Sequence, residues 1–241
     1  MTNNAIAPAS TPLESPSVFS HISSRRKTTN SLATFLVYAT MVIAMIPLVW
    51  VLWTVISRGL APVLTLDWWT ASQQGVLYHS PGGGALHAIV GTFTQTLIAS
   101  VLSIPIGLFT AIYLVEYANG NRLGRITTFM VDILTGVPSI VAALFVFTTW
   151  ITLFGFERSG MAVALSLVLL MVPVVVRNTE EMLRVVPMDL REASYALGVP
   201  KWKTIAKIVL PTALSGIVTG IMLSVARVMG ESAPVLILVG S

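Results

Sequence analysis

The sequence predicts an all-α protein that crosses a membrane several times, and its composition and hydrophobic pattern carry this prediction. Of its 241 residues, 55% are hydrophobic and only 10% are charged, whereas soluble domains carry about 25% charged residues. The mean hydropathy is +0.84. The apolar residues also gather into five runs, each at least as long as the shortest spanning helices of about 17 residues. A polytopic helical membrane protein follows from these features together.

The first 56 residues divide into a polar tail and an apolar run. Residues 1–30 are rich in Ser, Thr, Asn and Pro and lack periodicity, which predicts a disordered cytoplasmic tail. Residues 31–56 form an apolar run of 26 residues. The apolar core of a cleaved signal peptide is usually about 7–15 residues long. We therefore expect residues 31–56 to be the first transmembrane span and a permanent anchor.

Four more spans are expected after an extracytoplasmic loop at residues 57–87, which carries the interfacial aromatic residues Trp68 and Trp69. Residues 88–241 should form the main transmembrane domain, with a cytoplasmic loop at 178–211. The four runs are residues 88–115, 126–154, 160–176 and 212 to about 229.

The distribution of Lys and Arg predicts the orientation of the chain. With the N-terminus in the cytoplasm, eleven of the 14 basic residues fall in inside loops and two, Arg58 and Arg158, fall outside. Basic residues concentrate in cytoplasmic loops of membrane proteins. The eleven are Arg25, Arg26, Lys27, Arg122, Arg125, Arg177, Arg184, Arg191, Lys201, Lys203 and Lys207.

Several function classes are excluded by the same residues. The net charge of +4 does not indicate nucleic-acid binding, because no basic stripe is interleaved with aromatic residues. The chain has no cysteine, which excludes disulfides and thiolate metal sites. It also lacks a Walker motif, an HExxH motif and a nucleophile beside a base, so we expect no catalysis, no metal site and no cofactor on this chain.

A charged amphipathic stretch lies in the expected cytoplasmic loop. Asp189 can cap a helix N-terminus with Glu192 three residues later, which predicts a short helix at 190–197. Gly198 can take the left-handed conformation that ends a helix, and Pro200 suits the first turn of the next helix. Two short helices with a sharp bend would present a compact knob to another protein, although an ordinary cytoplasmic loop can also hold two helices.

The same stretch resembles the EAA loop of ABC-importer permeases. That pattern reads E-A-A, three residues, G, nine residues, I-x-L-P, and every spacing fits, with Ser194 as one small-for-small departure. In that family the loop is the coupling helix that docks into a groove of the ATPase subunit. The resemblance therefore implies that five residues couple this chain to an ATPase. They are Glu192, Ala193, Ser194, Gly198 and Pro211.

Other stretches resemble the PstA-type permeases of phosphate ABC importers, over roughly residues 25–241. They are residues 87–92, 104–107, 113–117, 136–139 and 230–234. The resemblance implies the type I ABC-importer permease fold with six spans, so that a sixth is expected to be missing after Ser241. It implies ATP-driven phosphate import through a multi-pass protein of the inner membrane. ATP and Mg would bind to a partner ATPase dimer.

The other implied partners are a second, PstC-like permease, an extracytoplasmic phosphate-binding protein and membrane lipid. Two alternatives stay open. The anion can be another oxyanion, such as sulfate, molybdate or tungstate, because the same arginine chemistry would serve. A stand-alone secondary transporter would leave the EAA spacing unexplained.

Arg227 and Glu231 are the clearest candidates for the substrate path. A charge deep in a span costs about 2.5–3.5 kcal/mol even on lenient scales, so it usually has a task. Their four-residue spacing predicts an ion pair on one helix face. The Arg227 guanidinium can bind phosphate bidentately, with Glu231 holding it until the anion arrives. A static ion pair near the outer interface is the alternative.

Ser139 and Arg177 are two further candidates for the substrate path. Ser139 follows Pro138, where a freed backbone carbonyl and a hydroxyl can line a path or mark a plain kink. Arg177 stands at the expected cytoplasmic end of a span, with Asp132 as a candidate partner.

Small residues predict close helix packing at two places. On one face of the second span they are Thr92, Thr96, Ser100, Ser103 and Gly107, for which packing is favoured over pore lining. In the last span Gly216 and Gly220 form a GxxxG pair, for which we expect the second permease as neighbour.

Overall fold

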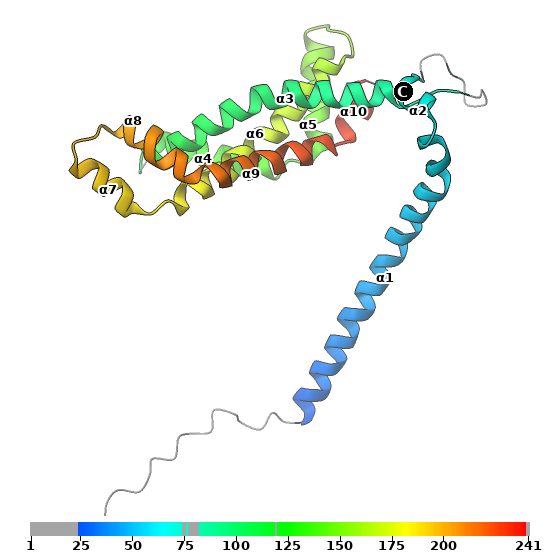
Figure 1. Ribbon diagram of the computed structural model, residues 1–241, viewed down its shortest axis with the longest axis horizontal. Coiled ribbons are helices and arrows are strands. Elements are labelled where there is room, and N and C mark those ends of the chain that lie inside the picture. The colour runs from blue at the N-terminus through cyan, green and yellow to red at the C-terminus, as the bar shows by residue number, and fades with distance from the viewer. Residues whose placement is uncertain (1–23, 74–75, 77–81, 119, 240–241) are drawn as a thin grey trace, which may run out of the picture. The chain divides into compact units, whose positions relative to one another are not determined.

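The computed structural model describes residues 24–73, 76, 82–118 and 120–239, and these contain helices and connecting turns without strands (Figure 1). The chain divides into two units, Met1–Leu66 and Asp67–Ser241. Four helices are long and apolar enough to span a membrane, and a bent pair brings the number to five. The predicted all-α polytopic class is confirmed.

The first unit is dominated by one helix, α1 (Ser24–Val63). It begins seven residues before the expected span at 31–56, so residues 24–30, which were expected in the tail, are helical. The Thr28 and Thr29 hydroxyls donate to the carbonyls of Ser24 and Arg25 one turn earlier, which supports this first part. The rest of the expected tail lies outside the described residues. None of the α1 side chains is buried, so its apolar surface requires a cover of lipid or of other helices.

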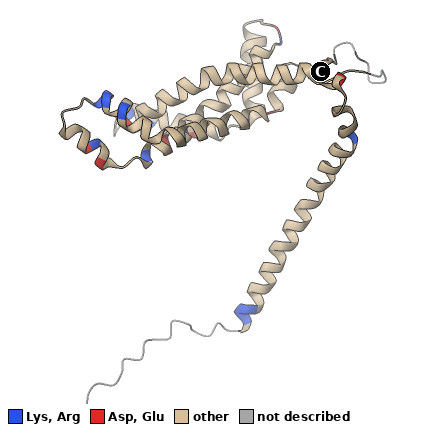
Figure 2. Cartoon of the chain, viewed as in Figure 1, with Lys and Arg blue, Asp and Glu red and all other residues tan. Residues whose placement is uncertain are grey.

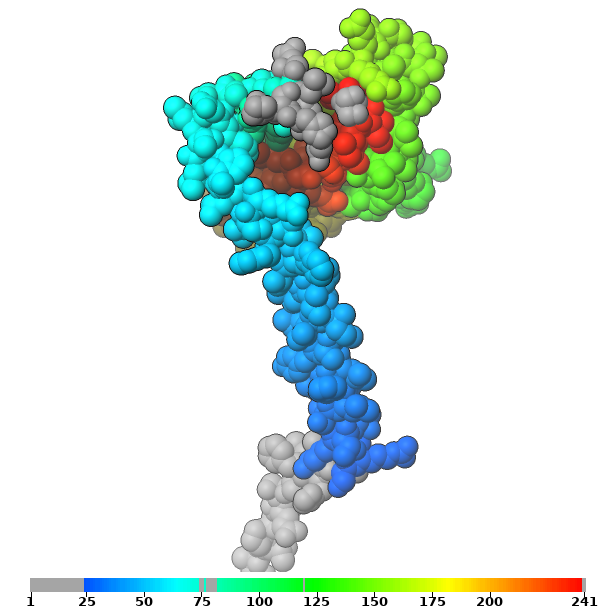
Figure 3. All heavy atoms as spheres, turned by 90° about the vertical axis from the view of Figure 1, so that its right-hand side faces the viewer, coloured from blue at the N-terminus to red at the C-terminus, as the bar shows by residue number. Residues whose placement is uncertain are grey.

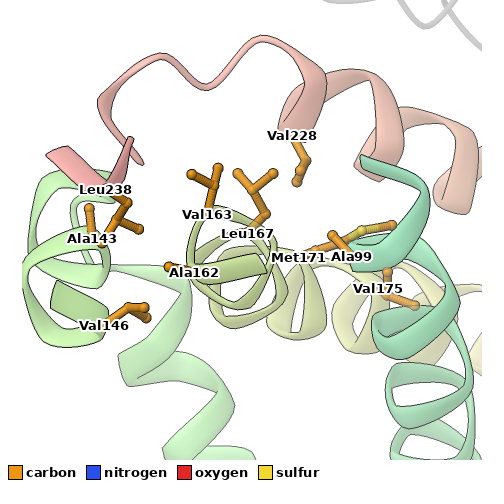
Figure 4. Close-up of a cluster of buried hydrophobic side chains, with 10 residues drawn as sticks. All are labelled: Ala99, Ala143, Val146, Ala162, Val163, Leu167, Met171, Val175, Val228 and Leu238. Atoms are coloured by element: carbon orange, nitrogen blue, oxygen red, sulfur yellow. The ribbon is translucent and has the colours of Figure 1, made fainter. Parts of the chain in front are cut away.

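In the second unit, α2 (Leu66–Thr70) reaches across the unit boundary. Three long helices then lie side by side: α3 (Leu86–Ile112), α6 (Gly160–Val185) and α9 (Leu210–Met229) (Figure 1). Two buried hydrophobic clusters hold them together. Figure 4 shows the first cluster, in which Leu167, Met171 and Val175 of α6 extend toward the neighbouring helices.

The small face of the second span packs inside the protein, as predicted. Thr96, Ser100, Ser103 and Gly107 of α3 are buried, and α3 lies against α6. At Gly107 the approach is closest, because an added Cβ would lie 2.6 Å from Val175 Cγ1. Glycine at this position therefore sets the distance between the two helices.

The glycine pair in the last span packs against the same chain, and the expectation of a partner permease there is wrong. An added Cβ at Gly216 would collide with the side chain of Met182, and one at Gly220 would lie 2.8 Å from Asn178 Cβ. Both neighbours belong to α6. Sequence spacing showed that a helix must approach closely, but it carries no information on which helix does so.

The expected third span, 126–154, is broken in the structure. The helix α4 (Arg122–Thr135) and the helix α5 (Ser139–Val146), extended by the π-turn η2 (Phe147–Leu153), meet at a bend of 104°. The kink expected at Pro138 is confirmed, because Gly136 ends α4 and Pro138 is the N-cap of α5. Proline cannot donate the hydrogen bond that would continue the first helix.

Two further π-turns interrupt the long helices. The turn η1 (Tyr113–Tyr117) continues α3, and its end is marked by the Ala118 N–H donating to the Tyr113 carbonyl at 2.8 Å. The turn η3 (Ile205–Val209) lies between α8 (Lys201–Thr204) and α9, so that one helix runs from Lys201 to Met229. Each π-turn places one extra residue in the helix.

The two ends of the second unit differ in chemistry. Charged residues gather at the end that carries α7 (Met188–Ala196) and α8 (Figure 2). At the opposite end α10 (Ala233–Leu238) lies against α5 (Figure 3). Thus the unit has an apolar body with one charged end, as the basic residues of the sequence predict.

Candidate functional site

The expected cytoplasmic segment forms two short helices joined by a sharp turn. The first, α7, has Pro187 at its N-cap and no side-chain cap, so the predicted capping box of Asp189 and Glu192 is wrong. Asp189 lies inside the first turn, where its charge favours the helix dipole. Proline at the N-cap already fixes the chain direction there, and a capping side chain is not needed to start the helix. Pro200 is likewise an N-cap, to α8, rather than a first-turn residue.

Gly198 makes the turn between these helices. Its φ is +74°, in the left-handed region that glycine occupies without steric cost. The Gly198 N–H donates to the Tyr195 carbonyl at 2.9 Å and the Val199 N–H donates to the Ser194 carbonyl at 3.2 Å. These bonds satisfy the last carbonyls of α7, and the predicted left-handed helix end is confirmed.

The three residues of the EAA pattern have different surroundings. Glu192 and Ala193 are exposed, whereas Ser194 is buried. The Ser194 Oγ lies 2.8 Å from Thr204 Oγ1 in a hydrogen bond between α7 and α8. Ser194 was interpreted as a neutral replacement for alanine, and the structure gives its hydroxyl a partner. The helices α7 and α8 and the Gly198 turn between them are called the module below. The exposed apolar residue Leu197, with 83% of its surface accessible, is the C-cap of α7 in this module.

Pro211 lies in the first turn of α9, within a helix that runs unbroken from Lys201 to Met229. A proline cannot donate to the carbonyl four residues earlier. The π-turn η3 directly before it already departs from the i→i+4 pattern, with the Leu210 N–H donating to Ile205 O. This arrangement explains how the helix passes through Pro211 unbroken.

A buried ion pair beneath the module was missed by sequence reasoning. Arg191 Nη1 of α7 donates to Glu116 Oε1 of η1, and both side chains are almost fully buried. Arg191 also donates to the carbonyl of Leu183 at 2.8 Å, and Lys201 donates to the carbonyl of Glu116. Glu116 lies 75 positions from Arg191. The one available signal was an acidic residue at the end of a strongly apolar run.

A second charge network holds Arg177. Its guanidinium pairs with Asp132 of α4 and with Glu180 of α6, so the predicted partnership with Asp132 is confirmed. Glu180 is almost fully buried and also accepts from Arg184 at 2.6 Å. The network links α4 to α6 near the charged end, and carboxylates already balance the charge of Arg177.

Arg227 and Glu231 are not brought together. The helix α9 ends at Met229, and Gly230 forms its C-cap, so Glu231 has left the helix. The predicted ion pair is wrong for this reason, since four-residue spacing aligns side chains only while the helix continues. Arg227 is exposed, and its side chain makes no hydrogen bond or ion pair with any residue that the structure describes. Arg227 lies in the last turn of α9, at the opposite end of this helix from η3 and α8.

Ser139 lies at the start of α5, directly after the break at Pro138, and is partly buried. A cavity of about 360 Å³ lies elsewhere, between α6 and α9. It is lined by polar groups that include Asn178, Glu181 and Thr219. The Asn178 amide donates to the Gly220 carbonyl at 3.2 Å, so α6 and α9 are tied together at the wall of this cavity.

Comparison with known families gives one match over more than half of the chain. Residues 103–241 match the family described as "Binding-protein-dependent transport system inner membrane component". This stretch contains the α7 and α8 module, the buried pair of Glu116 and Arg191, and the path candidates.

Similar proteins cover most of the chain. It is 60% identical to the "Phosphate transport system permease protein PstA 1" of Mycobacterium tuberculosis (strain CDC 1551 / Oshkosh), over 93% of this chain and 74% of that protein. It is 42% identical to the "Phosphate transport system permease protein PstA" of Yersinia pestis, over 88% of this chain and 70% of that protein.

Among solved structures, the fold resembles a chain of the MetNI methionine ABC transporter in an inward-facing conformation. The TM-score is 0.55 and the identity 23%, over 66% of this chain and 74% of that one. An amino acid ABC transporter gives a TM-score of 0.51 at 19% identity, over 60% and 66% of the two chains. These likenesses concern the fold.

Proposed function

The chain belongs to the binding-protein-dependent transport system inner membrane component family, and from this premise we propose that it is the PstA-type permease subunit of an ATP-driven importer of inorganic phosphate. As a member of this family it is a multi-pass membrane protein and a component of a transporter. The proposal extends to the anion, the partners and the residues that do the work.

The observation that carries the proposal is the module of α7, the Gly198 turn and α8. It stands at the charged end of the helix bundle, with Glu192, Ala193 and Leu197 exposed. A compact helix with small and apolar exposed residues fits a groove on a partner protein. The partner we propose is an ATPase dimer, which binds ATP and Mg, while this chain binds no cofactor itself.

The coupling residues have distinct roles in this proposal. Glu192 and Ala193 face the ATPase, Gly198 allows the turn, and Ser194 holds α7 to α8 through Thr204. The helix that contains Pro211 carries the movement of α8 into the membrane. When the ATPase dimer closes on ATP, the module moves and the spans change between outward-open and inward-open states.

The orientation proposed for the chain places the N-terminus and α7 in the cytoplasm of a cell bounded by its inner membrane. The charged end of the second unit supports it, because basic residues concentrate on the cytoplasmic side. The opposite end, with Arg227, then faces outward, where a phosphate-binding protein would deliver the anion.

Arg227 is the residue that we propose for anion binding along the path. Its guanidinium has no partner among the described residues, and an uncompensated arginine suits an anion that carries negative charge. Ser139, beside the break of the third span, is proposed to line the path. Glu231 and Arg177 are proposed to lie at the two ends of the path. The charge of Arg177 is balanced by its carboxylate partners, so we propose that it positions these groups and does not bind the anion itself.

A second permease subunit, PstC-like, is proposed to form the other wall of the path. Large apolar side chains of α9 such as Met222 and Leu223 are exposed on this chain. They require a cover of lipid or of another apolar helix surface.

The test is uptake of radiolabelled phosphate into proteoliposomes. These would hold this permease, the second permease and the ATPase, with the binding protein added outside. We expect ATP-dependent uptake that persists in excess sulfate and molybdate. Preferred uptake of sulfate or molybdate would replace the anion but keep the mechanism. Uptake without ATP would refute the coupling and support a secondary transporter instead.

A further inference from the structure

Four chain segments meet around the buried pair of Glu116 and Arg191. Glu116 lies in η1, where α3 ends, and Arg191 lies in α7. Only 4% of the Glu116 side chain and 8% of the Arg191 side chain are exposed. Arg191 reaches the carbonyl of Leu183 in α6, and Lys201 of α8 reaches the carbonyl of Glu116. Polar contacts of three side chains therefore link the ends of α3 and α6 to the module.

Stability alone does not explain why charges are buried at this place. Taking two charges out of water is costly, and an apolar pair of similar volume often gives equal or greater stability. What the charged pair adds is direction, because a guanidinium and a carboxylate hold a defined geometry that apolar contacts do not. The pair therefore fixes the position of α7 relative to α3.

The rest of α7 packs against the beginning of the helix that runs from Lys201 to Met229. The elements that pack most closely against it are α8 and η3, both on its C-terminal side. Its two ends are chain turns, at Pro187 before the helix and at Gly198 after it. Such turns let a short helix tilt. Arg191 is the side chain through which α7 reaches η1 and, through it, α3.

We propose that the ion pair of Glu116 and Arg191 is the strut that carries the displacement of α7 to α3. The two are positioning residues for transport, and this inference rests on the proposed function. Without the strut, α7 still docks and the ATPase still hydrolyses ATP, but α7 tilts about its two turns while α3 stays in place. Loss of the pair therefore uncouples hydrolysis from uptake.

The first experiment measures phosphate moved per ATP hydrolysed, in the whole complex reconstituted in proteoliposomes. For Glu116→Gln we expect this ratio to fall by roughly tenfold, with ATP hydrolysis retained. Arg184→Gln is the matched control, because it also removes a charge at this end of the unit. The ion partner of Arg184 is Glu180, which lies in the same helix, α6. The ratio for Arg184→Gln should stay within about twofold of the wild type.

An assembled Glu116→Gln complex with the wild-type ratio would overturn the strut. This result is distinct from a failure of the proposed function, in which the wild-type complex itself would move no phosphate with ATP.

A second experiment covers the case in which a lone buried charge prevents folding. The chain has no cysteine, so Glu116→Cys and Arg191→Cys together create one defined pair, with cysteine-free partner subunits. A cavity of about 400 Å³, lined by Glu116, Arg191 and Lys201 among others, admits a short bis-thiosulfonate reagent, which forms a reducible disulfide with each cysteine and releases a sulfinate at each end. Mass spectrometry verifies the cross-link.

The cross-linked complex should regain the ratio of phosphate moved to ATP hydrolysed, and reductant should abolish it again. An equal ratio before and after cross-linking would overturn the proposal, whether that ratio is high or low. The comparison uses one protein preparation, so a difference in folding between variants cannot produce the expected result.

Discussion

Ser194 and Thr204 share a buried hydrogen bond of 2.8 Å between their hydroxyl oxygens, across the turn that joins α7 to α8. The residues are ten positions apart, and the bond adds a directional contact between two helices that also pack against each other. The position that departs from the E-A-A pattern is thus the one that faces inward.

Replacing Ser194 by alanine should loosen this module without abolishing uptake, since alanine is the residue of the family pattern. A net loss of about 1 kcal/mol is typical for one hydrogen bond, which corresponds to roughly fivefold faster amide exchange in α7. Hydrogen exchange read by mass spectrometry measures it. Ser215→Ala, at an exposed serine of α9, is the control and should leave α7 unchanged. Unaltered exchange in Ser194→Ala would contradict the role given to the bond.

Gly198 should tolerate asparagine better than alanine or valine. No heavy atom lies within 4 Å of an added Cβ, so a substitution acts through the backbone at φ +74°. The left-handed conformation costs an ordinary residue about 1–2 kcal/mol, and asparagine visits it more readily. Phosphate uptake per ATP should decrease in the order Gly, Asn, Ala, Val. Equal uptake by the valine and asparagine variants would show that the turn is not required.

Gly107→Ala should destabilise the packing of α3 on α6 by about 1–3 kcal/mol, because the stiff, β-branched Val175 cannot move aside. Thermal unfolding in detergent measures the change. Gly91→Ala in the same helix is the matched control, since an added Cβ there meets nothing within 4 Å. Alanine should leave stability equal or raise it by up to about 1 kcal/mol there. Equal effects of both variants would refute the close approach.

Arg227→Gln should lower phosphate uptake by about tenfold or more, because hydrogen bonds to charged groups contribute about 1.5–3 kcal/mol. ATP hydrolysis should continue. Arg158→Gln is the control: this arginine lies over the ring of Phe147 and should be dispensable for uptake. A path that does not use Arg227 would leave uptake in Arg227→Gln at the level of the control.

The long apolar runs made the helical spans and the charged end predictable, because hydrophobic length and basic residues follow directly from the lipid environment. The left-handed turn at Gly198 was also predictable, since glycine adopts this conformation without steric cost and Pro200, two residues later, favours the start of a new helix. The break of the third span was visible as Gly136 and Pro138. Its angle was not, because the packing of α5 on α6 and α10 determines it.

Pairings over long sequence distances could not be predicted. Glu116 and Arg191 lie in different predicted elements, and nothing local marks them as partners. The pair of Arg227 and Glu231 shows the reverse error, since local spacing predicts contact only where the helix continues. Here the helix ends before Glu231, because Gly230 is its C-cap. For Gly216 and Gly220, the small residues were correctly interpreted as a contact surface, but the neighbouring helix is α6.

The π-turn at Ile205–Val209 also has a consequence for how this protein can change over evolution. It amounts to a one-residue insertion in a helix that otherwise runs from Lys201 to Met229. Removing one residue from an α-helix rotates everything before it by about 100° and shortens it by about 1.5 Å. At the π-turn, by contrast, a single-codon deletion would remove the extra residue and leave a regular α-helix, in which α8 and α9 keep nearly their present relative orientation. The chain can therefore lose one residue at this point without turning the exposed face of the cytoplasmic helices away from its partner.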